Sequence, residues 1–600
     1  MQNTLPELTM PQMLARNAET IGGETAIRQK EFGVWNPTDW QGYFARSENI
    51  AHGLRSLGLP AGGHVAILSE NRIEWVLAQM GTGLAGAVAV GVYATSPANE
   101  VGYVLEHSGS EIVVCEDQEQ ADKVIEVRAS LPALRRIVVI ETKGMRDYDP
   151  ALVITFDALE AQGAAARLAD PGFVAGVLAG QKLDDIGLMI YTSGSTGKPK
   201  GAMLSWRNLR AQAFAIRESL QMTRRDTHLS YLPLCHVAEQ MLTTMTPIYL
   251  GYRIDFGESL RTVQEDLREV APTTFLGVPR IWEKLHSSIH IGMMEAGGLR
   301  RRLHDRGVAA CEGFASVPAR QRSLGQKLTF QIYYWLIFRA LQNFIGLRRA
   351  RLAYTGAAPI SPKIVQYFRT IGVPLIEVYG ATETTGVALS QGLDRLEPGS
   401  VGVPIPNAEM RIGEMGELQM KGETVFAGYY RNPEATAQSI RDGWLHTGDV
   451  AEERDGQFRI VDRLKDIMIT AGGKNLSPSE IENTMKSSPY IKECIVIGER
   501  RRFVSALIQI DPEAVGKWAE EQNLAYTTFR SLAENPKVAG LIDAEVKAHN
   551  GSLAQVAQIR RFHLLTKELD HDDDEVTATM KVRRASIYKK YGTEIEALYA

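Results

Sequence analysis

One segment of this chain has the composition of an anion-binding loop, residues Tyr191–Gly201 (Tyr-Thr-Ser-Gly-Ser-Thr-Gly-Lys-Pro-Lys-Gly). Its glycines let the backbone fold closely around an anion and point N–H groups at it. Ser and Thr hydroxyls add donors and metal ligands, and two lysines add positive charge. A solvated Gly/Ser loop is the alternative, but such a loop rarely needs two lysines and a proline after an apolar run such as Ile186–Ile190. The segment therefore predicts a phosphate site.

This phosphate site is not of the Walker type. The Walker motif places four residues between its first glycine and Gly-Lys-Ser/Thr, whereas two residues separate Gly194 from Gly197. Pro199 also prevents a helix from starting at Lys198, because the residue before a proline is disfavoured in the α region. A different kind of phosphate cradle is therefore expected.

Two acidic residues stand in segments that suit a nucleotide. Glu383 lies among hydroxyls in Tyr379–Thr385, after the apolar run Pro374–Val378, where a carboxylate suits a hydrated Mg²⁺. Asp449 ends the segment Trp444–Asp449, and its carboxylate can accept both hydroxyls of a ribose. Each segment alone is typical of a polar loop or a Gly-Asp turn. Together with the phosphate segment, they predict a metal site and a ribose site.

The elements that must position these residues alternate between strand and helix patterns. Strand patterns at His64–Leu68, Ala87–Val92, Glu111–Cys115 and Arg136–Ile140 are separated by helix patterns. This order predicts an α/β fold with βαβ units and largely parallel, layered sheets covered on both faces.

The pattern changes along the second half of the chain. Short strands and turns predict a small β-rich subdomain over about 398–461, and residues 467–600 predict a compact α+β unit. We therefore expect a large N-terminal domain (1–461), a hinge (462–466) and a small C-terminal domain (467–600).

Composition limits the compartment and the partners. A net charge of −5 gives no case for nucleic-acid binding. The four scattered cysteines argue against a disulfide framework and for a reducing compartment. The N-terminus lacks the basic and apolar regions of a signal peptide. A cytoplasmic protein is expected.

Tyr191–Gly201 closely resembles the phosphate-binding signature of the adenylate-forming enzymes, a superfamily of acyl-CoA synthetases, peptide-synthetase adenylation domains and firefly luciferase. Tyr379–Thr385, Trp444–Asp449 and Asp462–Met468 follow in family order. The resemblance implies that Tyr379 stacks on adenine and that Glu383 and Thr192 bind Mg²⁺. It implies nucleotide-binding roles for Thr192, Ser193, Gly194, Ser195, Thr196, Gly197, Lys198, Lys200, Gly356, Ala357, Ala358, Tyr379, Gly380, Ala381, Thr382, Asp449 and Arg463.

The same resemblance assigns a lysine near the C-terminus. Residues 576–581 are Val-Thr-Ala-Thr-Met-Lys, where the long-chain branch of the family has Leu-Thr-Pro-Thr-Met-Lys, so Ala578 replaces a proline. By this match Lys581 is the adenylation lysine, whose ammonium would neutralise charge on the reacting carboxylate and the α-phosphate. Lys589 and Lys590 are poorer candidates. The acidic run His571–Glu575 is better interpreted as a solvated loop than as a metal cluster.

Three further segments acquire roles by resemblance. Pro233–Glu239 resembles the acyl-site loop, so His236 would border the acyl pocket, with a packed core histidine as the alternative. Lys465 stands where the family pivots its mobile C-terminal domain. The loop around Gly472, Gly473 and Lys474 resembles the one that contacts coenzyme A. The catalytic set implied by the family is Lys581, Glu383, His236 and Thr192.

A helical block between Trp282 and Arg351 resembles an insertion of the long-chain fatty acyl-CoA synthetases. Its segment Phe330–Phe338 is very apolar and lies between Arg300–Arg302 and Arg348–Arg351. Such a block can touch a membrane surface, but internal packing against the large domain is the expected arrangement.

The resemblance therefore implies an AMP-forming long-chain fatty acid–CoA ligase that uses ATP, coenzyme A and Mg²⁺. The chain is also expected to form a homodimer and to contact the inner face of the membrane peripherally. A ligase for an aryl or medium-chain acid, or an acyl-AMP ligase that loads a carrier protein, is the alternative within the superfamily. A non-catalytic acyl- or nucleotide-binding protein is disfavoured, because Lys581, Glu383 and Asp449 are all present.

Overall fold

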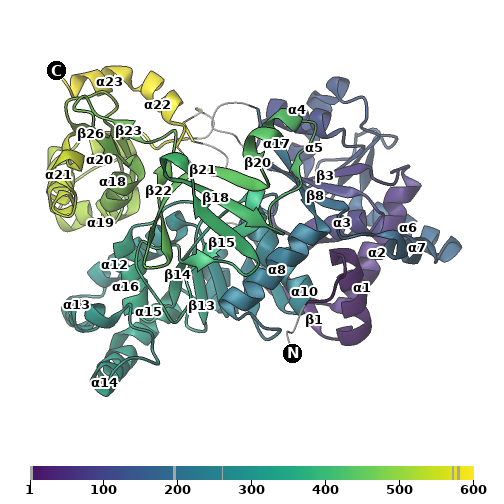
Figure 1. The fold of residues 1–600 in the computed structure, drawn as a ribbon, viewed down its shortest axis with the longest axis horizontal. Helices are drawn as coiled ribbons and strands as arrows, with labels where there is room; N and C mark the ends of the chain where they lie inside the picture. The colour runs from purple at the N-terminus through teal and green to yellow at the C-terminus, as the bar shows by residue number, and fades with distance from the viewer. Residues whose placement is uncertain (1–4, 193–197, 260, 571–572, 574, 577–581) are drawn as a thin grey trace.

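The structure is a computed structural model that describes residues 5–192, 198–259, 261–570, 573, 575–576 and 582–600. Two large sheets form most of the N-terminal part (Figure 1). The first is mainly parallel, with one antiparallel edge. Its strands, in spatial order, are β19 (Gly428–Tyr429), β9 (Lys200–Ser205), β8 (Ile186–Thr192), β4 (Val88–Val92), β3 (His64–Leu68), β5 (Ile112–Cys115), β6 (Arg136–Val139) and β7 (Val153–Thr155).

The second sheet has a parallel centre and antiparallel edges. Its strands, in spatial order, are β16 (Val403–Pro404), β15 (Gly386–Ser390), β14 (Leu375–Ala381), β13 (Leu352–Thr355), β12 (Thr274–Gly277), β10 (Thr227–Ser230), β11 (Arg253–Phe256), β1 (Thr25–Glu31) and β2 (Val34–Asp39). The central strands are short runs rich in apolar residues and buried throughout, as expected where helices cover both faces.

One hydrophobic core joins the two sheets through the helices between them. It combines Ile67 and Leu188 of the first sheet with Leu276 and Ile376 of the second, and helix α8 (Trp206–Leu220) adds Leu209. The remaining helices of this region cover the sheets. They are α1 (Met10–Ile21), α2 (Trp40–Ser56), α3 (Ile73–Leu84), α4 (Ala98–Ser108), α5 (Gln118–Glu126), α6 (Phe156–Ala169), α7 (Phe173–Gly180), α9 (Val237–Gln240), α10 (Thr246–Leu250), α11 (Val263–Val270) and α16 (Pro362–Thr370).

The strand patterns predicted over residues 64–140 are confirmed within one or two residues at each end. The predicted α/β fold class is confirmed as well, because parallel strands linked by helices build both sheets.

A third, antiparallel sheet forms the predicted β-rich region. It comprises β17 (Ala408–Ile412), β18 (Glu417–Gly422), β20 (Ile440–Arg441), β21 (Trp444–Arg454) and β22 (Gln457–Arg463). Helix α17 (Pro433–Ser439) packs beside it. The long hairpin β21–β22 carries Asp449 and ends at the predicted hinge.

The C-terminal part has its own core and its own sheet of β25 (Ile491–Ile497), β26 (Val504–Ile510) and β27 (Ile559–Leu564). A two-stranded hairpin, β23 (Met468–Ile469) and β24 (Asn475–Leu476), precedes it. Its helices are α18 (Pro478–Met485), α19 (Pro512–Glu521), α20 (Phe529–Ala533), α21 (Pro536–Asn550), α22 (Arg584–Lys590) and α23 (Gly592–Ala597). Motion of this part about residues 462–466 stays a prediction.

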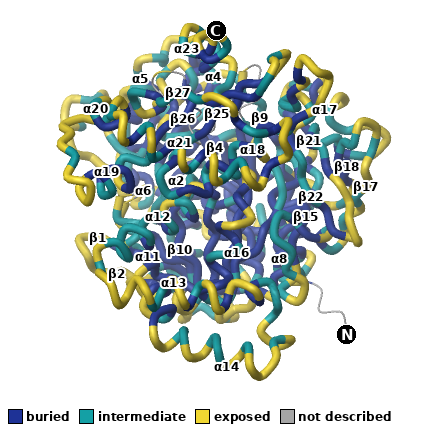
Figure 2. Tube along the Cα trace, turned by 90° about the vertical axis from the view of Figure 1, so that its left-hand side faces the viewer, coloured by how far each residue is buried: buried dark blue, intermediate teal, exposed yellow. Residues whose placement is uncertain are grey.

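The predicted helical block is present between β12 and β13. It consists of α12 (Pro279–Glu295), α13 (Gly298–Cys311), α14 (Leu324–Tyr333), the π-helical turn η4 (Tyr334–Phe338) and α15 (Arg339–Phe344). The expectation of internal packing is only half right. Ile337 and Phe338 are buried, whereas Trp335 and Leu336 are exposed by 65% and 54%, and Figure 2 shows α14 at the edge of the molecule.

The interpretation of His571–Glu575 as a solvated loop is wrong at its last residue, and His571, Asp572 and Asp574 lie outside the described residues. Glu575 is fully buried and accepts hydrogen bonds from the backbone N–H of Asp570 and the hydroxyl of Tyr591. Lys567 and Lys590 pair with it, so four partners compensate the burial of its charge. Among the described residues, no helix is both long and apolar enough to cross a bilayer.

Candidate active site

The predicted phosphate segment connects the antiparallel strands β8 and β9. Thr192 pairs with Lys200 in the last register position, and Ser193, Gly194, Ser195, Thr196 and Gly197 lie outside the described residues. Tyr103 of α4 flanks the segment, since its hydroxyl donates to the carbonyl of Pro199 and the Lys198 ammonium lies 4.8 Å from its ring centre. Lys198 and Pro199, at the described end of the segment, therefore lie beside α4.

Tyr429 connects this hairpin with the predicted metal ligand. The Lys200 ammonium lies 5.1 Å from the centre of the Tyr429 ring, and the Tyr429 hydroxyl donates to Glu383 Oε1 at 2.6 Å. Burial and the neighbouring Glu383 carboxylate raise the pKa of Tyr429, so the hydroxyl remains a donor at neutral pH. Two predicted site residues from different sheets are thus brought to one tyrosine.

Glu383 is positioned by the tight connection between β14 and β15. It lies in the short helix η5 (Thr382–Thr384), and its carbonyl accepts from the backbone N–H of Phe426. Gly380 makes this connection sterically feasible, because a Cβ there would meet the carbonyl oxygen of Gly386 at 1.8 Å. The carboxylate is therefore fixed at the C-terminal end of a parallel strand, where α/β sheets commonly bind ligands.

The predicted ribose carboxylate has two partners from the nucleotide set. The Tyr379 hydroxyl donates to Asp449 Oδ2 at 2.6 Å, and Arg463 Nε lies 3.3 Å from Asp449 Oδ1. Asp449 and Arg463 are register partners in the β21–β22 hairpin. Burial and Asp449 raise the pKa of Tyr379 far above its ordinary value. Tyr379, Asp449 and Arg463, which come from distant parts of the sequence, form one cluster.

The predicted adenine wall lies next to this cluster. Gly356, Ala357 and Ala358 directly follow β13, whose last residue, Thr355, pairs with Glu377 of β14. Ala357 and Ala358 are exposed, and Ala357 has a positive φ of 67°. Ala381 and Thr382 continue β14 into η5. The small side chains leave this backbone edge accessible to a flat ring.

His236 lies at the start of α9 and caps that helix, because its Nδ1 accepts from the backbone N–H of Ala238. The loop before it is tied to Asn71, whose Oδ1 accepts from the backbone N–H of Leu234. Buried Glu239 also accepts from the backbone N–H of Leu232. Both the functional and the structural interpretation of His236 fit this rigid, half-buried loop.

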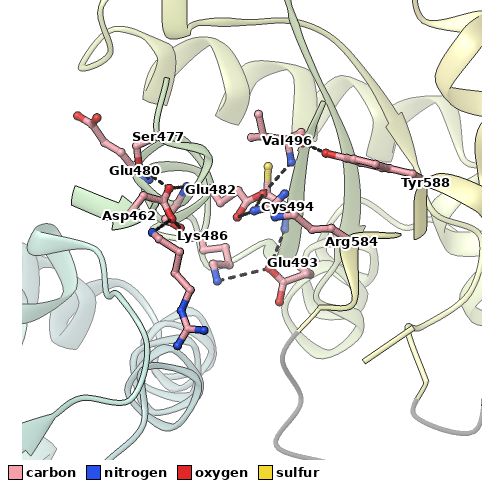
Figure 3. Close-up of polar contacts among 12 residues, drawn as sticks. Asp462, Ser477, Glu480, Glu482, Lys486, Glu493, Cys494, Val496, Arg584 and Tyr588 are labelled. Carbon is pink, nitrogen blue, oxygen red and sulfur yellow. Dashed lines mark hydrogen bonds and ion pairs between the residues drawn. The ribbon is translucent and has the colours of Figure 1, made fainter. Parts of the chain in front are cut away.

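The predicted hinge follows β22. The backbone N–H of Leu464 donates to the carbonyl of Gly448, and burial and nearby Arg463 lower the pKa of Lys465. Just before Lys465, buried Asp462 accepts a hydrogen bond from the hydroxyl of Ser477 at 2.7 Å (Figure 3). It also accepts from the hydroxyl of Ser479 at 2.9 Å. The side chain of Asp462 therefore fastens the start of α18 to the hinge.

The predicted coenzyme A loop is the exposed turn between β23 and β24. The Thr470 N–H donates to the carbonyl of Lys474, and Gly472, Gly473 and Lys474 are exposed. Lys581 lies outside the described residues, but both flanks of its segment are anchored. The carbonyl of Glu575 accepts from the backbone N–H of Arg583, and Val576 forms a β-bridge with Val582.

A partly buried ion pair fixes the chain three residues after Lys581. The Arg584 guanidinium contacts both carboxylate oxygens of Glu482 at 2.7 Å, and Glu482 also accepts from the backbone N–H of Val496 (Figure 3). The adjacent Arg583 lies 3.8 Å from Glu100 of α4. Glu100 is one helical turn from Tyr103, which flanks the phosphate segment. Arg583, which follows Lys581, and Pro199 of the phosphate segment therefore contact the same face of α4.

The donor set around Glu383 fits Mg²⁺. Within the described ranges, no group of three or more His, Cys, Asp or Glu side chains is arranged to hold a metal ion. Glu383 therefore offers a single carboxylate, with one oxygen held by Tyr429. Magnesium suits such a site, because it keeps several waters and binds substrate phosphates together with one or two protein oxygens.

The sequence analysis missed several residues that orient this site, namely Glu100, Tyr103, Tyr429, Asp462, Glu482 and Arg584. They lie outside the segments that resemble the family motifs or, like Asp462 and Arg584, at their edges. Only the folded contacts reveal these roles, because Glu482 in α18 and Arg584 at the start of α22 are 102 residues apart in the sequence.

Two family models match the chain: an AMP-binding enzyme over residues 14–430 and an AMP-binding enzyme C-terminal domain over residues 465–600. The long-chain-fatty-acid–CoA ligase FadD15 of Mycobacterium tuberculosis (strain ATCC 25618 / H37Rv) is 33% identical over 94% of this chain and 93% of that protein. The long-chain-fatty-acid–CoA ligase ACSBG2 of Rattus norvegicus is 28% identical over 99% of this chain and 93% of that protein.

Solved structures share the fold. The anthranilate CoA ligase AuaEII, in complex with anthranoyl-AMP, superimposes with a TM-score of 0.71 at 20% identity and covers 99% of both chains. A benzoate CoA ligase from Burkholderia xenovorans LB400 gives a TM-score of 0.69 at 19% identity over 97% of this chain and 99% of that chain. Because both family models match and relatives align along nearly its whole length, the chain belongs to the AMP-binding enzyme family.

Proposed function

We propose that this protein is an AMP-forming long-chain fatty acid–CoA ligase. The observation that carries the proposal is the convergence of the β8–β9 hairpin, Glu383 and the Asp449 cluster around the end of β14. The two long-chain-fatty-acid–CoA ligases that match over more than nine-tenths of the chain support the choice of substrate.

The first half-reaction is the attack of the acid's carboxylate on the α-phosphate of ATP, which releases pyrophosphate and leaves an acyl-adenylate. Asp449 holds the ribose, with Tyr379 and Arg463 orienting its two oxygens. Lys198 and Lys200 supply positive charge beside the phosphates, and Lys581 neutralises charge at the reacting centre. Glu383 and Thr192 would hold Mg²⁺, which when bound offsets charge on the phosphates.

The second half-reaction is the attack of the coenzyme A thiolate on the acyl carbonyl, with AMP as the leaving group. It requires the C-terminal part to rotate about Lys465, which withdraws Lys581 and presents the loop at Gly472–Lys474. His236 borders the acyl group. A cytoplasmic location is proposed, and the four free, buried cysteines are compatible with a reducing compartment. A homodimer stays a prediction.

A panel of acids tests the substrate class. Pyrophosphate release should peak with long-chain saturated or unsaturated acids, and acyl-CoA should form only when coenzyme A is added. A peak with aryl or medium-chain acids would assign the alternative ligase activity instead. Acid-dependent pyrophosphate release without transfer to coenzyme A would indicate that a carrier protein is the acceptor.

A further inference from the structure

The α13–α14 hairpin, defined as residues 298–344, presents an apolar surface that packs against nothing in the described chain. Its exposed side chains recur at intervals of three or four residues along α14 and η4, so they share one face of a continuous helix. They are Leu324, Leu328, Ile332, Trp335 and Leu336, with exposed fractions of 86%, 64%, 49%, 65% and 54%.

The opposite face of the same helix carries apolar side chains that pack inward, partly buried in α14 and buried in η4. Phe338 is fully buried, and Tyr333 packs so closely on α13 that a Cβ at Gly307 would meet its ring at 2.9 Å. Between Leu324 and Phe338 the only charged residue is Lys327. Contiguous exposed apolar side chains of this size commonly mark an interaction surface, so the outer face calls for an apolar partner.

The charge of the hairpin indicates which partner. Residues 298–344 contain eight Lys or Arg and two Asp or Glu, although the whole chain has a net charge of −5. In the described part of the chain, none of these eight basic side chains has a carboxylate within ion-pair distance. Arg320 and Lys327 are exposed, and the Arg339 guanidinium lies 4.8 Å from the Trp335 ring centre.

This combination matches the boundary between the headgroups and the acyl chains of an anionic bilayer. Leu and Ile side chains enter the acyl region, Trp prefers the interface, and Arg and Lys reach the phosphates. A second copy of the chain would also cover apolar surface, but it would have to accept a cluster of like charges facing its own. The long axis of α14 lies at an outer edge of the molecule in both views, where a flat membrane can approach it (Figures 1 and 2).

We propose that the α13–α14 hairpin docks this protein on bilayers that contain anionic lipids, with Leu328, Ile332, Trp335 and Leu336 inserted at the interface. The purpose of docking rests on the proposed function, because docking would bring the enzyme to the phase in which long-chain acids dissolve. The docking surface itself does not depend on that function.

Co-sedimentation of the full-length protein with vesicles tests the proposal. Vesicles of phosphatidylcholine with phosphatidylglycerol should bind the protein, and phosphatidylcholine alone should bind it much more weakly. The double variant L328Q/W335Q should reduce partitioning about tenfold or more, because it removes apolar surface from the interface. The variant R320Q/K327Q should reduce binding to the anionic vesicles about fivefold for each removed charge, and high salt should mimic it.

The control is L168Q, which removes an equally exposed leucine (87%) at the end of α6, far from α14 in Figure 1, and should bind like wild type. All the replaced side chains are exposed, so equal melting temperatures are expected. The proposal is overturned if wild type does not bind anionic vesicles, or if L328Q/W335Q and L168Q bind equally well. It is also overturned if light scattering shows a dimer that L328Q/W335Q dissociates while vesicles bind none of the proteins.

Ligase activity separates this result from the proposed function. With a short, water-soluble acid and no vesicles, L328Q/W335Q should keep the wild-type rate. A protein that binds vesicles but activates no long-chain acid would contradict the proposed function and leave the docking surface intact.

Discussion

Two tyrosine hydroxyls hold the two carboxylates on which the candidate site depends. Tyr379 donates to Asp449 and Tyr429 donates to Glu383, each at 2.6 Å. Hydrogen bonds to an ionised carboxylate are stronger than neutral ones and fix its orientation. At the scale of single residues, we therefore expect substitutions to separate the ribose role of Asp449 from the metal role of Glu383.

The variant D449N tests the ribose role. The amide keeps the size of the side chain but loses the charge and one of the two acceptor oxygens. Loss of a charged hydrogen bond corresponds to about a tenfold to hundredfold rise in the KM for ATP. Initial rates of pyrophosphate release measure this change. D455N, an exposed turn residue of the same hairpin, should leave the KM unchanged, and an equal effect of both variants would contradict the assignment.

The variant Y429F tests whether the Tyr429 hydroxyl orients Glu383, the proposed Mg²⁺ ligand. Phenylalanine keeps the ring beside Lys200 but removes the hydroxyl that holds Glu383 Oε1. We expect the Mg²⁺ concentration for half-maximal rate to rise about tenfold. The matched control is Y430F on the adjacent residue. If Y429F and wild type require the same Mg²⁺ concentration, Tyr429 does not orient the ligand.

At the scale of elements, β14 organises the site, because Tyr379, Gly380 and Ala381 lie along it and η5 continues it to Glu383. The strand also carries Glu377, which is 7% exposed and accepts from the backbone N–H of Gly399. Burial raises the pKa of this carboxyl from 4.5 to about 7, and Arg369 only partly offsets the effect of burial.

This raised pKa predicts a pH dependence of stability. The folded state binds the proton more tightly, so the contribution of Glu377 is fully present below pH 4.5 and is lost as pH rises through 7. The difference corresponds to about 3 kcal/mol. E377Q mimics the protonated form and keeps the acceptor for Gly399. From about pH 5 to about pH 8, wild type should therefore lose thermal stability relative to E377Q. If the melting temperatures of wild type and E377Q change by the same amount over this pH range, the prediction is wrong.

The ion pair between Glu482 and Arg584 is a second feature that acts at the scale of elements, because it joins α18 to the start of α22. Glu482 and Arg584 form a partly buried pair in which Arg584 Nη2 contacts both carboxylate oxygens, and Arg584 follows Lys581 by three residues. We expect R584K, which keeps the charge but loses the guanidinium nitrogen that contacts both carboxylate oxygens, to slow acyl-adenylate formation about tenfold to hundredfold through misplacement of Lys581. Thioester formation from supplied acyl-adenylate should change little. Equal slowing of both half-reactions would indicate a purely structural role, and a melting curve checks that the domain remains folded.

At the scale of the whole molecule, the C-terminal part rests against the large part through separate contacts. Lys517 pairs with Glu295 at 3.2 Å, Arg583 approaches Glu100, and the Tyr490 hydroxyl lies 3.4 Å from His290 Nε2. The exposed ion pairs contribute little individually, so this arrangement can be exchanged for another at small cost. Such an interface suits a domain that serves two half-reactions in turn.

The parallel strands were predictable from the sequence, because runs such as His64–Leu68 are apolar and β-branched and are bounded by turn residues. The segments that carry the proposed nucleotide residues were recognisable as motifs, and the roles of those residues stay predictions. The contacts among them were not predictable, because Tyr429 meets Glu383, and Glu100 meets Arg583, only after strands or domains distant in the sequence come together. The sequence could not show which apolar side chains of α14 are exposed either, because only the position of α13 decides that Tyr333 packs inward and Leu328 does not.

The most direct test of the account follows both half-reactions in wild type and in K581A with a long-chain acid. Wild type should yield acyl-CoA, AMP and pyrophosphate in equal amounts. K581A should release pyrophosphate at a rate lower by about a hundredfold or more, yet convert supplied acyl-adenylate and coenzyme A into acyl-CoA at close to the wild-type rate. Undiminished pyrophosphate release by K581A, or release of ADP and phosphate by wild type, would contradict the account.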